Sequence, residues 1–238
     1  MGILGRMRPK TLDHVAYWVA DRDSLAGFAT SHLGMHVIER TERFTLVGAD
    51  ARRGKLTFFA AQGSRERGAL AHVAFRVNDL DAALDAMPES VEIERRDGGA
   101  YFDAGQGVRL GLVEAETESE YDLDHVALYS SDPAQTAEQY ARYGFHSTEP
   151  SADGNPRVEV GGAWVEFLRG DPGEPEQPLL NHVAVLVDSA EEHGLEAEQI
   201  GVEIDDFVDA PSTGAVFLRA PERVRVEYVE HKPTFSLT

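Results

Sequence analysis

The sequence predicts an α+β fold made of four copies of one βαβββ unit. The phrase His-Val-Ala opens each copy, at His14, His72, His125 and His182. Each phrase lies in an apolar run typical of a strand, and a capped helical segment and three short strand-like runs follow it. His14 and His125 are 111 residues apart, and His72 and His182 are 110 apart. This nearly constant offset indicates an internal duplication.

Capping residues and glycines separate the elements of each unit. Asp21 offers a capping side chain before a helix that Gly34 ends, and Asp132 with Pro133 begins a helix that Gly144 ends. The first unit is predicted as strand 12–19, helix 24–32 and strands 35–40, 43–48 and 55–61, and the second as strand 71–77, helix 80–87 and strands 91–95, 99–103 and 107–114. The third is predicted as strand 123–130, helix 133–143 and strands 145–149, 157–160 and 163–169, and the fourth as strand 181–187, helix 190–200 and strands 203–208, 214–219 and 223–230.

An acidic stretch from Glu114 to Glu120 separates the second unit from the third. Its sequence, Glu-Ala-Glu-Thr-Glu-Ser-Glu, is typical of a linker between compact units. We therefore expect two domains of two units each, residues 1–116 and residues 117–238.

Composition excludes several classes of protein. The chain has 238 residues, 42% of them hydrophobic, and no cysteine. Disulfides, thiolate metal sites and a cysteine nucleophile are therefore excluded. No apolar run reaches the roughly 18 residues of a membrane span, and the N-terminal apolar stretch is too short for a secretory signal, so we expect a cytoplasmic protein with no membrane partner. The formal net charge of −20 also argues against a nucleic-acid partner.

The acidic excess is dispersed along the chain, and lysine occurs only at Lys10, Lys55 and Lys232. This composition resembles that of proteins from salt-accumulating halophiles. At molar salt the Debye length falls to roughly 3 Å, which screens the repulsion between acidic side chains. The sequence therefore predicts a protein that loses structure at low salt.

Four side chains in the second half have the chemistry of a metal site. His125 and His182 lie in the opening strands of the third and fourth units, and Glu166 and Glu227 lie in the closing strands of the same units. Alternate strand residues share a face, so these side chains can point into one cavity. Two imidazoles with one or two carboxylates suit Fe(II), Mn(II), Zn(II) or Ni(II).

The corresponding positions of the first half lack carboxylates. They are His14, Phe58, His72 and Gly111. Two imidazoles alone rarely hold a catalytic ion, so we expect the first half to be a scaffold without metal. The alternative for any one of these histidines is a structural role in a strand, and Glu166 could instead pair with an arginine or face solvent.

With these units and candidate ligands, the chain resembles the vicinal oxygen chelate superfamily, also called glyoxalase/bleomycin resistance/dioxygenase. The resemblance implies paired βαβββ units that form two half-open mixed β-barrels around a divalent metal. His125, His182 and Glu227 fall on the metal-ligand positions of type I extradiol dioxygenases, and the segment from Phe217 to Glu227 is similar to that family's closing signature, with Phe217 in place of a tyrosine. This implies ring cleavage of an aromatic diol, with Fe(II) as the preferred ion.

A second member of the superfamily fits the same residues. Glyoxalase I of bacterial type uses two His and two Glu, an order that His125, Glu166, His182 and Glu227 reproduce. This implies Lewis-acid isomerase or lyase chemistry on a carbonyl–thiol adduct, with Glu166 as a candidate base. A non-catalytic binding or resistance protein is the third alternative. The sequence leaves the oligomeric state open, a homo-oligomer included.

Overall fold

Four βαβββ units are present in the computed structural model, which describes residues 7–49, 53–96 and 98–237. The first unit contains β1 (Thr11–Val19), α1 (Arg22–His32), β2 (His36–Arg40), β3 (Phe44–Gly48) and β4 (Lys55–Ala60). The second contains β5 (Leu70–Val77), α2 (Leu80–Asp85), β6 (Glu94–Arg96), β7 (Gly99–Asp103) and β8 (Arg109–Glu114). The predicted α+β class and the order of elements are confirmed in these units.

The second half repeats this order, with two additional 3-10 turns and a short β10 strand. The third unit contains β9 (Asp122–Ser130), α3 (Pro133–Tyr140), the 3-10 turn η1 (Ala141–Tyr143), β10 (His146–Ser147), β11 (Arg157–Val160) and β12 (Ala163–Arg169). The fourth contains β13 (Leu180–Val187), α4 (Ala190–Gln199), β14 (Ile204–Asp209), β15 (Thr213–Arg219), the 3-10 turn η2 (Pro221–Arg223) and β16 (Arg225–His231). None of the helices in the described ranges is long and apolar enough to cross a membrane.

Side-chain caps begin all four α-helices of the described residues. The carboxylate of Asp21 accepts a hydrogen bond from the Ser24 amide, and Asp79 and Asp132 cap α2 and α3 in the same way. Ser189 caps α4 through its hydroxyl. These caps satisfy amide groups that have no partner inside the helix. Helices α2, α3 and α4 begin at the residue that the sequence predicts, and α1 begins two residues earlier, at Arg22.

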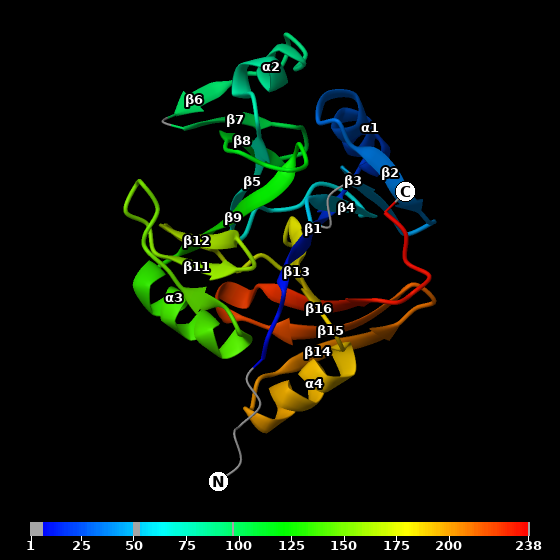
Figure 1. Cartoon of the computed structure of the whole chain (residues 1–238), viewed down its shortest axis with the longest axis vertical. Helices are drawn as coiled ribbons and strands as arrows, with labels where there is room; N and C mark the ends of the chain where they lie inside the picture. The colour runs from blue at the N-terminus through cyan, green and yellow to red at the C-terminus, as the bar shows by residue number, and fades with distance from the viewer. Residues whose placement is uncertain (1–6, 50–52, 97, 238) are drawn as a thin grey trace.

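Within the described residues, the strands form two eight-stranded sheets whose pairing is nested along the chain. One sheet has the order β14-β15-β16-β13-β1-β4-β3-β2, and the other has the order β10-β11-β12-β9-β5-β8-β7-β6. The first unit thus pairs with the fourth, and the second pairs with the third, as the chain colours in Figure 1 show. This differs from the expected domains 1–116 and 117–238, because each sheet takes one unit from either side of that boundary.

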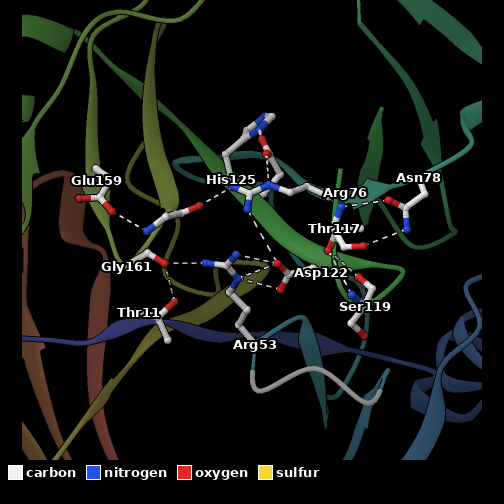
Figure 2. A network of polar contacts seen from close by, with 12 residues as sticks. Thr11, Arg53, Arg76, Asn78, Thr117, Ser119, Asp122, His125, Glu159 and Gly161 are labelled. Atoms are coloured by element: carbon white, nitrogen blue, oxygen red, sulfur yellow. Dashed lines mark hydrogen bonds and ion pairs between the residues drawn. The ribbon is translucent and has the colours of Figure 1, made fainter. Parts of the chain in front are cut away.

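A glycine and an arginine lie where the two sheets meet. A Cβ added at Gly161 would lie 2.0 Å from the Lys10 carbonyl oxygen, so only glycine allows β1 to approach the third unit this closely. Arg53, from the segment before β4, donates to the Asp122 carboxylate at 2.8 Å and to the Gly161 carbonyl at 2.6 Å (Figure 2). One core cluster contains buried apolar residues from both sheets.

Candidate metal centre

Strand register brings three donor side chains to one face of the first sheet. His14 on β1 is opposite Ala184 on β13, and Ala184 is opposite Glu227 on β16. Opposite residues share a face, and so do residues two apart in one strand, so His182 joins His14 and Glu227. The site therefore contains one imidazole from the first unit, and one imidazole and one carboxylate from the fourth.

The donor atoms of these three residues lie close together. The Nε2 atoms of His14 and His182 are 2.9 Å apart. Glu227 Oε2 is 2.9 Å from His182 Nε2 and 3.2 Å from His14 Nε2. All three ligand atoms lie within 4.8 Å of one another. Ligand bonds of divalent transition ions are roughly 2.0–2.2 Å long, so one ion could contact all three atoms without a change of backbone.

Neighbouring side chains fix the orientation of both imidazoles. Asp13 Oδ1 is 2.7 Å from His14 Nδ1, and Asn181 Oδ1 is 3.0 Å from His182 Nδ1. Asp13 also accepts a hydrogen bond from buried Lys55 at 2.9 Å. Partners of this kind on the second ring nitrogen leave Nε2 free to face the site, which is how metal-binding histidines are held in proteins.

The charges of the site influence one another strongly. Burial alone would lower the pKa of His14, but its contacts with Asp13 and Glu227 raise that pKa to about 9. Burial would raise the pKa of Glu227, but the charge of His182 and the contact with His14 hold it well below its usual range. The pKa of His182 is lowered, chiefly by burial. Glu227 is therefore ionised at neutral pH, the state that ligation needs, whereas the proton on His14 is one that a bound ion would displace.

The donor set fits a divalent transition ion. Glu227 Oε2 is buried, and among the described residues it has no hydrogen-bond donor in good geometry. A buried carboxylate oxygen without such a donor is costly, and a cation beside it removes that cost. Two imidazoles and one carboxylate are also the donors that Fe(II), Mn(II), Zn(II) and Ni(II) accept. The residues therefore match the metal requirement that the sequence predicts.

A cavity of about 410 Å³ opens over these donors. Its walls come from both units of the sheet and are rich in aromatic side chains. The aromatic lining residues are Trp18, Phe44, Phe59, Phe217 and Phe235. Its volume lies within the usual range for small-molecule binding pockets.

His231 also lines this cavity, at the end of β16. Its Nε2 lies 3.2 Å from Asp13 Oδ2, and its ring is stacked on Phe235 with centroids 3.8 Å apart. Sequence reasoning did not identify His231 as a site residue because it lies outside the repeated phrase. Its spacing of four residues from Glu227 places both side chains on one face of β16, and this is the signal that could have identified it.

The structure brings together only part of the predicted ligand set. His182 and Glu227 lie in the site with His14, which was expected to be scaffold. His125 and Glu166 lie in the other sheet, beside His72. The physical reason is the nested pairing of units, which gives each sheet two of the four phrase histidines and one of the two glutamates.

The position that corresponds to Glu227 in the first unit also differs by one residue from the prediction. Ala16 is opposite Thr57, just as Ala184 is opposite Glu227. Thr57 therefore faces the cavity, whereas Phe58, the expected equivalent, is buried in the core. The first sheet holds a single carboxylate among these four strand positions.

Comparison with known proteins agrees with this architecture. Residues 11–121 match the sequence model of the Glyoxalase/Bleomycin resistance protein/Dioxygenase superfamily. The crystal structure of a "putative dioxygenase" from Bacillus subtilis subsp. subtilis str. 168 is similar, with a TM-score of 0.79 and 17% identity over 96% of this chain and 87% of that one. Glyoxalase I from Zea mays has a TM-score of 0.71 and 16% identity over 92% of each chain. No curated protein sequence matches the chain. At these identities, the two structures establish a shared fold.

Proposed function

The chain carries a domain of the glyoxalase/bleomycin resistance protein/dioxygenase superfamily, and from this premise we propose that it is a divalent-metal-dependent dioxygenase that opens the ring of a small aromatic diol. The observation that carries the proposal is the donor set of His14, His182 and Glu227 at the base of an aromatic cavity. Two imidazoles and one carboxylate are typical of non-haem Fe(II) oxygenases, since they leave coordination positions open for two reactants.

His14, His182 and Glu227 would hold the ion in this enzyme. When bound, an Fe(II) ion supplies a path for electrons between the diol and dioxygen. In the overall reaction, a carbon–carbon bond next to a hydroxylated carbon breaks and both oxygen atoms of dioxygen enter the product. No further reductant is needed, because the diol itself is oxidised.

The aromatic walls would bind and orient the ring of the substrate. Trp18, Phe59 and Phe217 offer faces and edges against which a flat ring can stack. Phe59 and Phe217 also contact the His182 ring, with centroids 6.2 Å and 5.2 Å away. A ring held by these side chains lies next to the donor atoms, and the same side chains keep bulk water away from them.

In this proposal His231 accepts a proton from a substrate hydroxyl. It lines the cavity, and Asp13 lies 3.2 Å from its Nε2. A neutral imidazole in this position can take up the proton, and the carboxylate of Asp13 stabilises the resulting charge. Asp13 also contacts His14, so the proton acceptor and the metal ligand share one buried carboxylate.

The alternatives from the sequence have less support. Glyoxalase-type chemistry in its bacterial form uses two carboxylates, but Glu166 lies in the other sheet and Thr57 occupies the fourth position of this site. A non-catalytic binding protein needs a cavity but no converging set of oriented ligands. The single carboxylate therefore favours the dioxygenase.

The experiment that tests the proposal is anaerobic reconstitution with Fe(II), followed by air and a panel of catechols. We expect yellow ring-cleavage product and uptake of one dioxygen per diol. His182→Ala should lose the colour, while Glu198→Gln, on the exposed face of α4, should retain it. Turnover of a methylglyoxal–thiol adduct with Ni(II) or Zn(II), without any catechol cleavage, would contradict the proposal.

A further inference from the structure

The second sheet repeats the geometry of the metal centre. His72 on β5 and His125 on β9 have their Nε2 atoms 2.9 Å apart, the same distance as in the pair of His14 and His182. The ring centroids are 5.1 Å apart in both pairs, with interplanar angles of 78° and 77°. This agreement extends to the orientation of the rings, which shows that the duplication preserves the arrangement of the side chains.

A carboxylate completes the second cluster in the equivalent position. Ala127 on β9 is opposite Glu166 on β12, as Ala184 is opposite Glu227 in the first sheet. Glu166 Oε2 lies 3.8 Å from His125 Nε2. Asn155 donates a hydrogen bond to Glu166 Oε1 at 2.9 Å, which leaves Oε2 directed towards the imidazoles. This separation is longer than the 2.9 Å between Glu227 Oε2 and His182 Nε2, so the Glu166 carboxylate would have to move towards the imidazoles when an ion binds.

The second cluster is also buried and supported from behind. His72, His125 and Glu166 are 7%, 9% and 9% exposed. Asp124 Oδ2 lies 2.6 Å from His125 Nδ1, as Asp13 lies next to His14.

Arg76 continues this support away from the cluster. It donates to Asp124 at 2.7 Å and to the Gly162 carbonyl, and Figure 2 shows it close to His125. The outer partners that orient a metal-binding histidine are therefore present around His125.

We propose that His72, His125 and Glu166 form a second binding site for a divalent first-row transition ion. The site would take the same class of ion as the first, since its donors are again two imidazole nitrogens and one carboxylate oxygen. The chain would then bind two ions, one in each sheet.

The two sites differ in the space above the donors. Tyr101 packs against His72 with ring centroids 4.7 Å apart. Gly111 occupies the position of Thr57 and makes room for that ring, because a Cβ at Gly111 would be 2.6 Å from Tyr101 Cε1. Arg96 and Arg109 lie over the other parts of the Tyr101 ring, at 5.3 Å and 5.9 Å from its centroid.

Tyr101 thus fills the region that corresponds to part of the substrate cavity of the first sheet. The second ion would therefore stabilise its sheet without a role in turnover. Substitutions at the second site should change the number of bound ions and leave ring cleavage in place.

The number of bound ions per chain tests this proposal. Metal-free protein is titrated calorimetrically with Mn(II) and with Zn(II), and the ions retained after gel filtration are counted by mass spectrometry. We expect two ions for the wild type, one for Glu166→Gln, one for His182→Asn and none for the double variant. His146→Asn, which changes an exposed histidine of the second sheet, should retain two.

The outcome against the proposal is one ion in the wild type that is lost in His182→Asn and kept in Glu166→Gln. The imidazoles of His72 and His125 would then be joined only by a hydrogen bond. His125→Asn provides a second test if Glu166→Gln does not fold, as judged by circular dichroism. The count of ions is independent of catalysis, so failure of ring cleavage leaves this test intact.

Discussion

His14 Nε2 lies 2.9 Å from His182 Nε2, although the two residues are 168 positions apart in the sequence. The contact exists because β1 pairs with β13 at the centre of the first sheet. A metal held by both rings therefore joins the first unit to the last, and its binding depends on the pairing of these units.

Removal of the carboxylate at Glu227 tests the ligand set. Glu227→Gln keeps the shape of the side chain but loses the charge, so we expect Fe(II) affinity to fall by more than the roughly 10- to 100-fold that loss of an outer partner costs. Ring cleavage should be lost with it. Calorimetric titration measures the affinity, and unchanged affinity would remove Glu227 from the site.

A second carboxylate at Thr57 should change the preference for metal and reaction. Thr57→Glu places a Glu opposite Ala16, in the position that Glu227 has opposite Ala184. We expect Zn(II) to bind roughly tenfold more tightly, or about 1.4 kcal/mol, and ring cleavage to fall because less space remains for two reactants. Thr57→Val, which removes the hydroxyl only, is the control and should retain both properties.

Asp13 should contribute to stability as well as to metal binding. It is buried and contacts Lys55, which is also buried, through a 2.9 Å ion pair. Loss of one partner of a buried pair costs roughly 3 kcal/mol, so Asp13→Asn should lower the free energy of unfolding by about that amount. Urea denaturation in chelator measures the change. A loss below about 0.5 kcal/mol, typical of a surface position, would contradict this interpretation.

The stability of the metal-free protein should depend on pH through His14. Its folded-state pKa is raised to about 9 from an ordinary value of 6.5. A raised pKa means that the folded state binds the proton more tightly, so this contribution is complete below pH 6.5 and is lost as the pH rises through about 9. In chelator, the melting temperature should fall between pH 7 and pH 10. His14→Gln should reduce that fall. An identical fall in the wild type and in His14→Gln would argue against a raised pKa of His14.

Salt should stabilise the fold. The net charge of −20 creates repulsion between acidic side chains, and raising the salt from 0.1 M to 1 M shortens the Debye length from about 10 Å to about 3 Å. We expect the melting temperature to rise with KCl over this range. A melting temperature that does not depend on KCl would show that repulsion between the acidic groups has little effect.

The units of the fold could be predicted because their signals are local. Asp21 and Asp132 cap their helices as expected, and Gly34 and Gly144 follow the ends of α1 and η1 in the left-handed conformation that favours glycine. Such signals depend on residues close together in the chain. The repeat then extends the prediction of helix and strand order from one unit to all four.

The choice of partner for each unit could not be predicted in the same way. Every unit presents a similar opening strand to its neighbour, so the constant offset is compatible with pairing of adjacent units or with nested pairing. The prediction that His125 and His182 share one metal site assumes pairing of adjacent units. The position of Thr57 was missed by one residue, and in a strand an error of one residue exchanges the buried face for the other face.

Nested pairing also orders the events of folding. The second and third units are joined by the short segment between β8 and β9, so their sheet requires closure of a small loop. The other sheet must bring β1 and β13 together across the whole of that intervening structure, and contacts distant in sequence form slowly. We therefore expect the sheet of the second and third units to form before the sheet of the first and fourth units. Because His14 meets His182 and Glu227 only in the sheet of the first and fourth units, rapid-mixing measurements should detect binding of the ion at this site only in the final kinetic phase, later than the ion held by His72, His125 and Glu166 in the other sheet.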